Sequence, residues 1–291
     1  MRQNSMNKDY LNSIMSQLYH YVAFSFKKPL SEFDKASLII SIDIDVGSSE
    51  LGVKNGGYND RNVNDFLSEF AIGKIEEQVV PLLLKVFNEV EFPATFALRG
   101  QLTEVENSII NLILESSTPQ EIAAHGYYHK AFTTLSESEA EEELRMVSAG
   151  MKKFGIEPKS FVFPRNKISH LLFLERYGYL AFRGRGNLFN DGMYVSKCGN
   201  LFDVHPSIWL DFYDSTISKK IVNLAVKYRA PLHIWFHPWN LGNSRQVAAE
   251  RITKSLLPLI EYARKKKMQG ALKFKTMGSI AEKYQLSEKL Q

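Results

Sequence analysis

The feature that most constrains the fold of this chain is a repeated alternation between short apolar runs, rich in β-branched residues, and longer segments of helical period. The strand-like runs are LIISID (38–43), ATFAL (94–98), EIAAH (121–125), KSFVFP (159–164), YLAFRG (179–184) and PLHIWFHP (231–238). Helical spacing separates them at 75–90, 105–116, 135–155, 169–178 and 215–229. The segment 135–155 opens with a capping box, Ser136 to Glu139, and stops at Gly155. Alternation of this kind predicts crossover units and a parallel sheet.

The expected fold class is therefore α/β, with a distorted (β/α)7-type barrel in a single domain. The length of 291 residues is ordinary for such a barrel, and the apolar share of 44% and charged share of 23% are those of a globular protein. We assign residues 1–35 to an N-terminal extension and residues 36–291 to the barrel. The glycine-bearing segment 46–62 is too long for a tight connection, and a long loop after a barrel strand is usually functional.

Composition argues against several classes of protein. No segment is apolar for the roughly eighteen residues that a membrane span needs, and the N-terminus lacks the apolar region of a signal peptide. The single cysteine, Cys198, allows no intramolecular disulfide, so we expect a reducing compartment, the cytoplasm. The net charge of +4 is spread along the chain apart from the run 264–267, interpreted as a solvated helix face. We expect no nucleic-acid partner and no transmembrane segment.

Polar side chains stand at three predicted strand ends, where the chemistry of parallel barrels is found. Asp43 and Asp45 are separated by one residue and project from the same face of the first strand. His125 and His129 follow a later strand, and a helical turn beginning at Gly126 would place both imidazoles on one side. A third group, His237 in HIWFHPW, ends the last of these strands before a proline.

One carboxylate and two imidazoles make a facial site with open positions, which is the composition of a catalytic zinc site. Each feature alone also has a structural explanation. A histidine pair at spacing four arises by chance, an Asp-x-Asp at a strand end can be a turn or a helix cap, and a strand-end histidine can be a hydrogen-bonded packing residue. The occurrence of all three, in order, at the ends of successive strands favours a divalent metal site, with Zn²⁺ as the expected ion.

These residues carry a resemblance to the polysaccharide deacetylase family, also called the NodB homology domain or carbohydrate esterase family four, over roughly residues 36 to 285. The first family motif, an Asp pair that ends a strand, is matched by SIDID (41–45). The second, His-(Ser/Thr)-x-x-His, is matched by HGYYH (125–129), where glycine replaces the usual hydroxyl residue. The third has a rearranged counterpart in FPRN (163–166), and the last resembles WFHPWN (235–240). The split Asp pair is similar to that of intracellular and peptidoglycan-type branches.

The resemblance implies a NodB-like barrel and a metal-dependent carbohydrate deacetylase. It implies that Asp45, His125 and His129 bind the metal, that Asp43 is the general base and that His237 is the general acid. The chemistry supports these roles, because amide hydrolysis at neutral pH needs an activated water and a protonated leaving amine.

Several further residues are candidates for the site. Arg165 is interpreted as a catalytic residue that orients Asp43 by charge pairing or binds an anionic substrate group. Trp209, His205 and Trp239 are assigned to substrate binding, with His205 as a second candidate acid. Trp209 and Arg165 could instead be a core aromatic and a surface arginine. His233 lies deeper on the same strand face as His237 and is interpreted as structural.

The resemblance implies removal of an acetyl or other acyl group from an N-acetylated sugar of a surface polysaccharide or its precursor. The precursor would be lipid-linked or nucleotide-linked, and the modest basic charge suits a phosphate-bearing substrate. Two alternatives stay open: a cyclic amidase or allantoinase-like hydrolase on the same barrel, and a catalytically inactive glycan-binding relative. Metal content and the identity of the hydrolysed substrate distinguish them.

Overall fold

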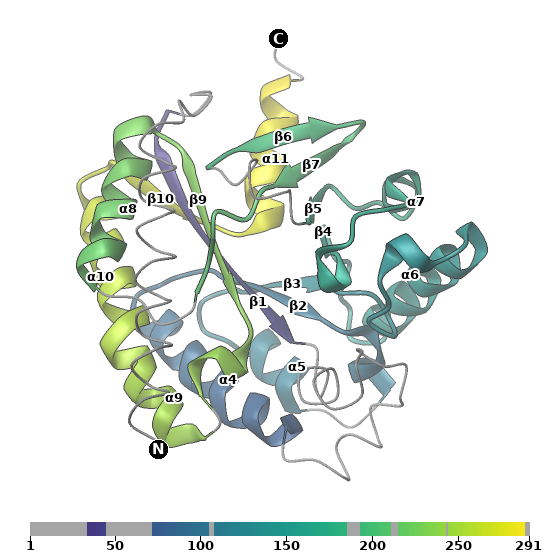
Figure 1. Ribbon diagram of the computed structural model, residues 1–291, viewed down its shortest axis with the longest axis horizontal. Coiled ribbons are helices and arrows are strands. Elements are labelled where there is room, and N and C mark those ends of the chain that lie inside the picture. The colour runs from purple at the N-terminus through teal and green to yellow at the C-terminus, as the bar shows by residue number, and fades with distance from the viewer. Residues whose placement is uncertain are drawn as a thin grey trace, which may run out of the picture.

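The computed structural model describes residues 34–44, 72–104, 108–184, 193–210, 215–242 and 244–288. Residues 1–33 of the predicted extension, the predicted ligand Asp45 and the predicted loop 46–62 lie outside the described residues. A single sheet forms the centre of the molecule, and helices pack around it (Figure 1).

Strand β1 (Ala36–Ile44) lies in the middle of this sheet, and all nine of its residues are buried. Its parallel neighbours are β2 (Thr95–Leu98), β9 (Pro231–Phe236) and β10 (Leu272–Lys275). The parallel order continues from β2 through β3 (Glu121–Ala124), β4 (Ser160–Val162), β5 (Ala181–Arg183) and β7 (Leu201–Val204). Strand β6 (Val195–Cys198) is antiparallel to β7, and β8 (Ile208–Trp209) is parallel to β9. Continuous apolar strands of this kind are typical of parallel sheets covered on both faces.

The segment between β7 and β8 connects the two ends of the curled sheet, which together form a distorted, incompletely paired barrel. Strand β7 pairs with β5 at one end of the strand order and β8 pairs with β9 at the other end, yet only residues 205–207 separate them. The backbone N–H of Ser207 donates to the carbonyl of His233 at 2.8 Å, which brings this segment against β9. Strand β10 pairs only with residues 36–39 of β1, beside β2, and so distorts the ring. The predicted distorted (β/α)7-type barrel is confirmed.

Helices surround the curled sheet (Figure 1), and the last of them lies on its inner face, where Met277, Ile280 and Ala281 pack with Ile39, Ala97 and Ala123. The helices are α4 (Ile72–Glu89), α5 (Ser108–Leu114), α6 (Glu137–Lys152), α7 (Leu171–Arg176), α8 (Ser215–Tyr228), α9 (Arg245–Arg251), α10 (Leu257–Met268) and α11 (Met277–Glu288). The predicted helices and strands are confirmed in type and order, as is the capping box of Ser136 and Glu139 at the start of α6. Strands β6, β7, β8 and β10 and helices α9 and α11 were not predicted, whereas the helix face expected at 264–267 lies in α10. In the described part of the chain, no helix combines the length and apolar character needed to cross a bilayer.

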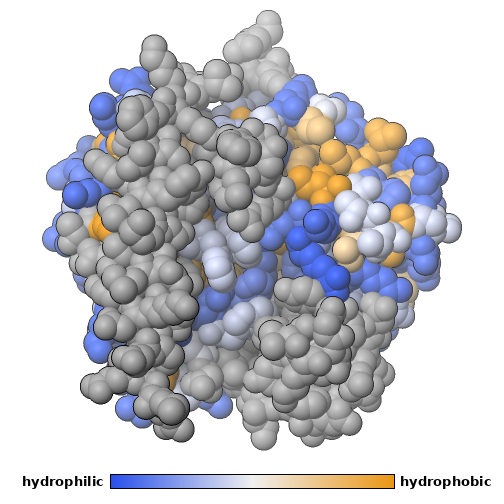
Figure 2. All heavy atoms as spheres, viewed as in Figure 1, coloured by the Kyte–Doolittle hydropathy of each residue, from blue (hydrophilic) through white to orange (hydrophobic). Residues whose placement is uncertain are grey.

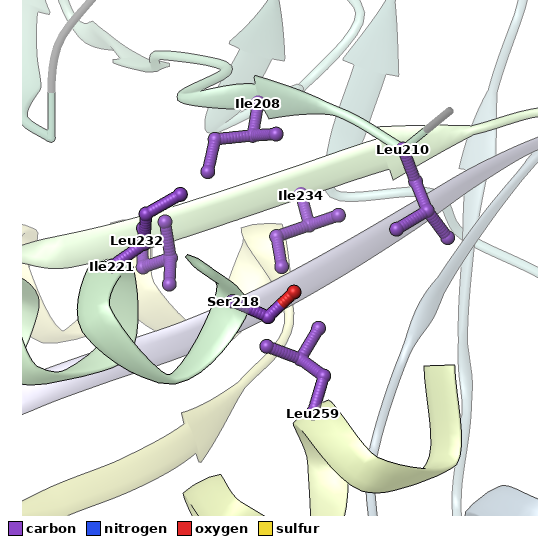
Figure 3. Close-up of a pocket in the computed structure, with 7 residues that line it drawn as sticks. All are labelled: Ile208, Leu210, Ser218, Ile221, Leu232, Ile234 and Leu259. Carbon is purple, nitrogen blue, oxygen red and sulfur yellow. The ribbon is translucent and has the colours of Figure 1, made fainter. Parts of the chain in front are cut away.

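Packing between the barrel and its helices leaves little free volume. The cavity between the β8–β9 pair and helices α8 and α10 measures about 10 Å³ (Figure 3). Its lining is apolar apart from Ser218, and a space of this size holds at most about one water molecule. On the outer face shown in Figure 2, the described residues are mostly hydrophilic, with hydrophobic side chains gathered on one side. The packing between β8, β9, α8 and α10 is therefore close.

Glu121, at the amino-terminal end of the barrel strands, binds the start of the C-terminal helix α11. Its carboxylate accepts hydrogen bonds from the hydroxyls of Thr95 (2.8 Å) and Ser160 (2.6 Å) and from the backbone N–H of Gly278 (3.0 Å to each oxygen). The last of these bonds satisfies an amide in the first turn of α11, which has no partner within its own helix. A side chain at Gly278 would place its Cβ 2.6 Å from the Glu121 Oε1, so any larger residue there would displace this carboxylate from its present position.

We predict that Glu121→Ala lowers the free energy of unfolding by about 1.5–3 kcal/mol, the range for hydrogen bonds to a charged acceptor. Urea denaturation followed by circular dichroism measures the loss. Glu115→Ala is the control, because Glu115 is exposed at the end of the neighbouring helix and its replacement should change stability by less than about 0.5 kcal/mol. Equal stability of the two variants would contradict the assigned role of Glu121.

Candidate active site

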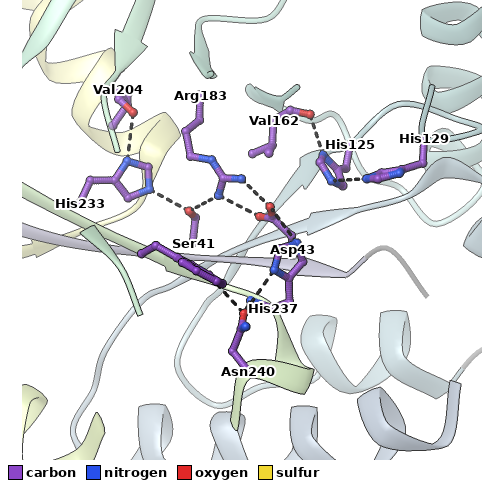
Figure 4. Close-up of polar contacts among 11 residues, drawn as sticks. Ser41, Asp43, His125, His129, Val162, Arg183, Val204, His233, His237 and Asn240 are labelled. Carbon is purple, nitrogen blue, oxygen red and sulfur yellow. Dashed lines mark hydrogen bonds and ion pairs between the residues drawn. The ribbon is translucent and has the colours of Figure 1, made fainter. Parts of the chain in front are cut away.

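Asp43 is the centre of the polar cluster at the carboxyl end of β1 (Figure 4). Its side chain is buried, and both of its oxygens accept hydrogen bonds from Arg183, at 2.8 Å from one guanidinium nitrogen and 2.5 Å from the other. Arg183 ends β5, across the barrel from β1, and its guanidinium carbon lies 4.6 Å from the ring centroid of Trp235. This bidentate pair fixes both the charge and the orientation of the carboxylate.

A buried chain of hydrogen bonds connects Arg183 to Ser41, His233 and the carbonyl of Val204. Arg183 donates to the hydroxyl of Ser41 at 2.7 Å, so the Ser41 proton is left to point at Nε2 of His233, 2.8 Å away. His233 must then carry its proton on Nδ1, which lies 3.0 Å from the carbonyl of Val204. Burial lowers the pKa of His233 to about 3, so this imidazole is neutral at physiological pH. His233 is structural, as predicted.

Opposing effects set the protonation state of Asp43. Burial raises the pKa of its carboxyl group, but the charge of Arg183, helped by His125 and His237, outweighs burial and holds the pKa below its ordinary value. The carboxylate is therefore ionised at neutral pH.

His237 approaches Asp43 from β9. It follows the last residue of the strand, at the start of the short helix η4 (Pro238–Leu241), and its Nε2 lies 3.8 Å from Oδ2 of Asp43. The side-chain oxygen of Asn240 accepts from the backbone N–H of His237 at 2.8 Å and lies 3.3 Å from Nδ1 of the ring. Because an amide oxygen only accepts, Nδ1 carries the proton and Nε2 is the atom that exchanges protons near Asp43. The ring also stacks on Trp239, with centroids 4.2 Å apart.

His125 and His129 lie together, but the local structure differs from the prediction. The expected helical turn after Gly126 was wrong, because the structure shows a loop in which Gly126 and His129 have left-handed backbones, with φ of 65° and 60°. The two Nε2 atoms are nevertheless 3.1 Å apart. Nδ1 of His125 lies 2.7 Å from the carbonyl of Val162 and so carries the proton, which leaves the Nε2 lone pair of His125 facing His129.

This pair fits two of the three predicted metal ligands. Two nitrogens bound to one tetrahedral zinc ion at about 2.0–2.1 Å each lie about 3.3 Å apart, close to the observed separation. The carbonyl of Val162 supplies the outer hydrogen bond that metal-bound histidines usually make. The third predicted ligand, Asp45, lies outside the described residues, and within the described ranges no group of three or more His, Cys, Asp or Glu side chains could hold a metal.

The remaining predicted residues occupy different surroundings. Arg165 follows β4 in a short helical turn with φ of 57°, while the charge partner of Asp43 is Arg183. Trp209 is 45% exposed at the end of β8, and its indole N–H lies 3.4 Å from the oxygen of Asn240, beside His237. His205 is buried and stacks on Tyr194, with its Nδ1 3.6 Å from Asp203.

Arg183 is the important residue that the sequence analysis missed. The available signal was a charged residue closing the otherwise apolar strand-like run YLAFRG, at the same barrel edge as the other candidate side chains.

Comparisons with known proteins agree with this fold. The sequence model described as polysaccharide deacetylase matches residues 65–181. A search of curated proteins finds no match. A crystal structure from Mycobacterium smegmatis, provisionally assigned as a polysaccharide deacetylase, is similar with a TM-score of 0.67, at 18% identity over 90% of this chain and 95% of that one. A Pseudomonas aeruginosa PAO1 structure with a similar assignment has a TM-score of 0.60, at 16% identity over 84% and 89% of the two chains. The Puue allantoinase structure also has a TM-score of 0.60, at 15% identity over 89% and 94%.

We predict that Arg183→Met destabilises the protein by about 3–5 kcal/mol, because it leaves the buried charge of Asp43 without its partner. The double variant Asp43→Asn/Arg183→Met should regain part of this loss, and a double-mutant cycle of urea denaturations measures the coupling. Arg145→Met is the control, since Arg145 pairs with Glu142 at the exposed surface and such pairs contribute less than about 1 kcal/mol. Additive effects of the two buried substitutions would contradict the pairing.

Proposed function

We propose that this chain, which is similar to the polysaccharide deacetylase family over residues 65–181, is a metal-dependent hydrolase that removes an acetyl group from an N-acetylated sugar. The observation that carries the proposal is the position of the Asp43 carboxylate. It is ionised, fixed by Arg183, and within reach of the acid candidate His237 (Figure 4). His125, one of the two facing imidazoles, stands near enough to help lower its pKa.

Asp45, His125 and His129 would hold the metal ion, most suitably Zn²⁺. When bound, such an ion supplies a Lewis acid for the acyl oxygen and lowers the pKa of water. The facing Nε2 atoms of the two histidines support this assignment, because the Nδ1 proton of His125 is committed to the carbonyl of Val162.

The described residues account for the two proton transfers of amide hydrolysis. Asp43 takes the proton of the attacking water as that water adds to the acyl carbon. Nε2 of His237 then gives a proton to the nitrogen of the leaving amine as the carbon–nitrogen bond breaks, which yields acetate and a free amine. Asn240 holds the Nδ1 proton of His237, so that the transferred proton belongs to Nε2.

The proposed substrate is an N-acetylated saccharide of a surface polysaccharide or its lipid-linked or nucleotide-linked precursor. The exposed ring of Trp209 and the ring of Trp239, stacked on His237, offer apolar faces for a sugar beside the acid. Arg165 and His205 are proposed for contacts with other parts of the substrate, with an anionic group as the partner of Arg165. We propose the cytoplasm as the site of action, in keeping with the single cysteine.

We predict that Asp43→Asn lowers the rate of acetate release from N-acetylated oligosaccharides by about 10²–10⁴-fold, the usual contribution of a general base. Acetate is measured by an enzyme-coupled assay over a panel of saccharides. Asp34→Asn is the control, because Asp34 lies before β1 and its ion pairs with Lys273 and Lys283 are exposed. An undiminished rate in Asp43→Asn would remove the assigned base, and metal-independent hydrolysis of cyclic ureides would favour the allantoinase-like alternative.

We predict that the purified protein binds one divalent ion per chain and that His125→Ala and His129→Ala each reduce this content to background. Elemental analysis after dialysis measures it, and a strong chelator should abolish acetate release from the wild type. His170→Ala is the matched control, since His170 bonds the carbonyl of Leu135 away from the site. Full metal content in both ligand variants would end the proposal that they hold the ion.

A further inference from the structure

A carboxylate from helix α6 enters the loop that carries the two histidines. Glu143 is only 3% exposed, and its Oε2 accepts the backbone N–H groups of Tyr127 at 2.6 Å and Tyr128 at 3.0 Å. These two residues lie between His125 and His129. Glu143 therefore binds the middle of the segment whose two ends present the facing imidazoles.

The loop has no regular structure of its own to satisfy these amides. Residues 125–131 form neither helix nor strand, so each buried N–H needs an acceptor from elsewhere. On the other side of the segment, the backbone N–H of Gly100 donates to the carbonyl of Gly126 at 2.8 Å, and that of Gln101 donates to Tyr127 at 3.4 Å. The loop is held between the short helix η1 (Gly100–Glu104) and the Glu143 carboxylate.

The conformation held in this way is an uncommon one. His129 has a left-handed backbone, with φ of 60°, and a non-glycine residue in such a sparse region costs on the order of 1–3 kcal/mol. A Cβ at Gly126 would lie 3.0 Å from the Pro164 ring and 3.4 Å from Oε2 of Glu143, so the wall around the loop is tight. A short segment in an uncommon conformation keeps its geometry only while its surroundings determine it.

We propose that Glu143 is a positioning residue that sets the separation and direction of the His125 and His129 imidazoles, and through them the affinity of the site for a divalent cation. The inference rests on the proposed function in one respect, the assignment of these histidines as metal ligands. Glu143 acts through the backbone N–H groups of Tyr127 and Tyr128.

A purely architectural role is the competing account. In that case Glu143 only anchors α6 to the barrel, and its loss lowers the stability of the metal-free protein without changing its affinity for metal. Glu142 provides the matched comparison, because it precedes Glu143 on the same helix but is exposed and pairs with Arg145. Replacing either residue by glutamine removes one charge from α6.

The test compares Glu143→Gln and Glu142→Gln with the wild type as metal-free proteins. A glutamine at 143 keeps one acceptor oxygen but turns an NH₂ group into the space that the carboxylate filled. Co²⁺ is titrated while its visible absorption is recorded, and Zn²⁺ affinity is measured by competition with a chromogenic chelator. We expect Glu143→Gln to weaken metal binding about 10–100-fold, the range for losing a residue that orients metal ligands, and to change the Co²⁺ spectrum. Glu142→Gln should match the wild type.

Wild-type affinity and spectrum in a folded Glu143→Gln variant would overturn the inference, whatever its stability. Should that variant not fold, Glu143→Asp retains the charge on a shorter side chain, and the same criterion applies to it. Weakened metal binding in a protein that releases no acetate would sustain the inference and defeat the proposed function. If the wild type releases acetate and all variants bind metal with equal affinity, the proposed function stands and the role of Glu143 is wrong. If the wild type binds no divalent ion, the proposed function and the role of Glu143 are both wrong.

Discussion

The buried ion pair between Asp43 and Arg183 is the interaction on which the rest of this structure depends. Taking two charges out of water costs several kcal/mol per ion, and only close geometry with further hydrogen bonds offsets that cost. Here the guanidinium meets both carboxylate oxygens, donates also to Ser41 and lies over the ring of Trp235. The pair joins β1 to β5, which are not neighbours in the sheet, so the barrel interior has to be polar along this line.

That polar line also contributes to closing the barrel. His233 of β9 bonds Ser41 of β1 through one ring nitrogen and the carbonyl of Val204, at the end of β7, through the other. The His233 imidazole therefore hydrogen-bonds both Val204, at the start of the segment between β7 and β8, and the Ser41 hydroxyl, which accepts from Arg183. Stability and the orientation of Asp43 share these residues, and a change that loosens the closure also loosens the carboxylate. Coupling of this kind explains why polar groups occupy the centre of an otherwise apolar core.

The sequence was most informative where chemistry and chain order coincide. Apolar runs and helical spacing predicted the elements through β5, α8 and β9, and Asp43, His125, His129 and His237 were placed at the correct edge. The Asp43–Arg183 pair spans 140 positions and depends on which strands face each other, which no local pattern encodes. A helical turn beginning at Gly126 was expected to bring His125 and His129 to one side, but the left-handed backbones of Gly126 and His129 bring the imidazoles together without it. Strand β8 has only two residues, too few for a periodic signal.

The lowered pKa of Asp43 provides an argument for a bound metal that residue spacing alone does not provide. Arg183 keeps Asp43 ionised by lowering its pKa, and the same effect makes the carboxylate a weak base. A weak base removes a proton readily only from an acidic donor, and ordinary water is a very poor one, so this arrangement suits a water whose own pKa has been lowered. The paired Nε2 atoms of His125 and His129 are the described groups best suited to hold a cation with that effect. The strong pairing of Asp43 thus favours metal-assisted hydrolysis over a mechanism in which the carboxylate acts on free water alone.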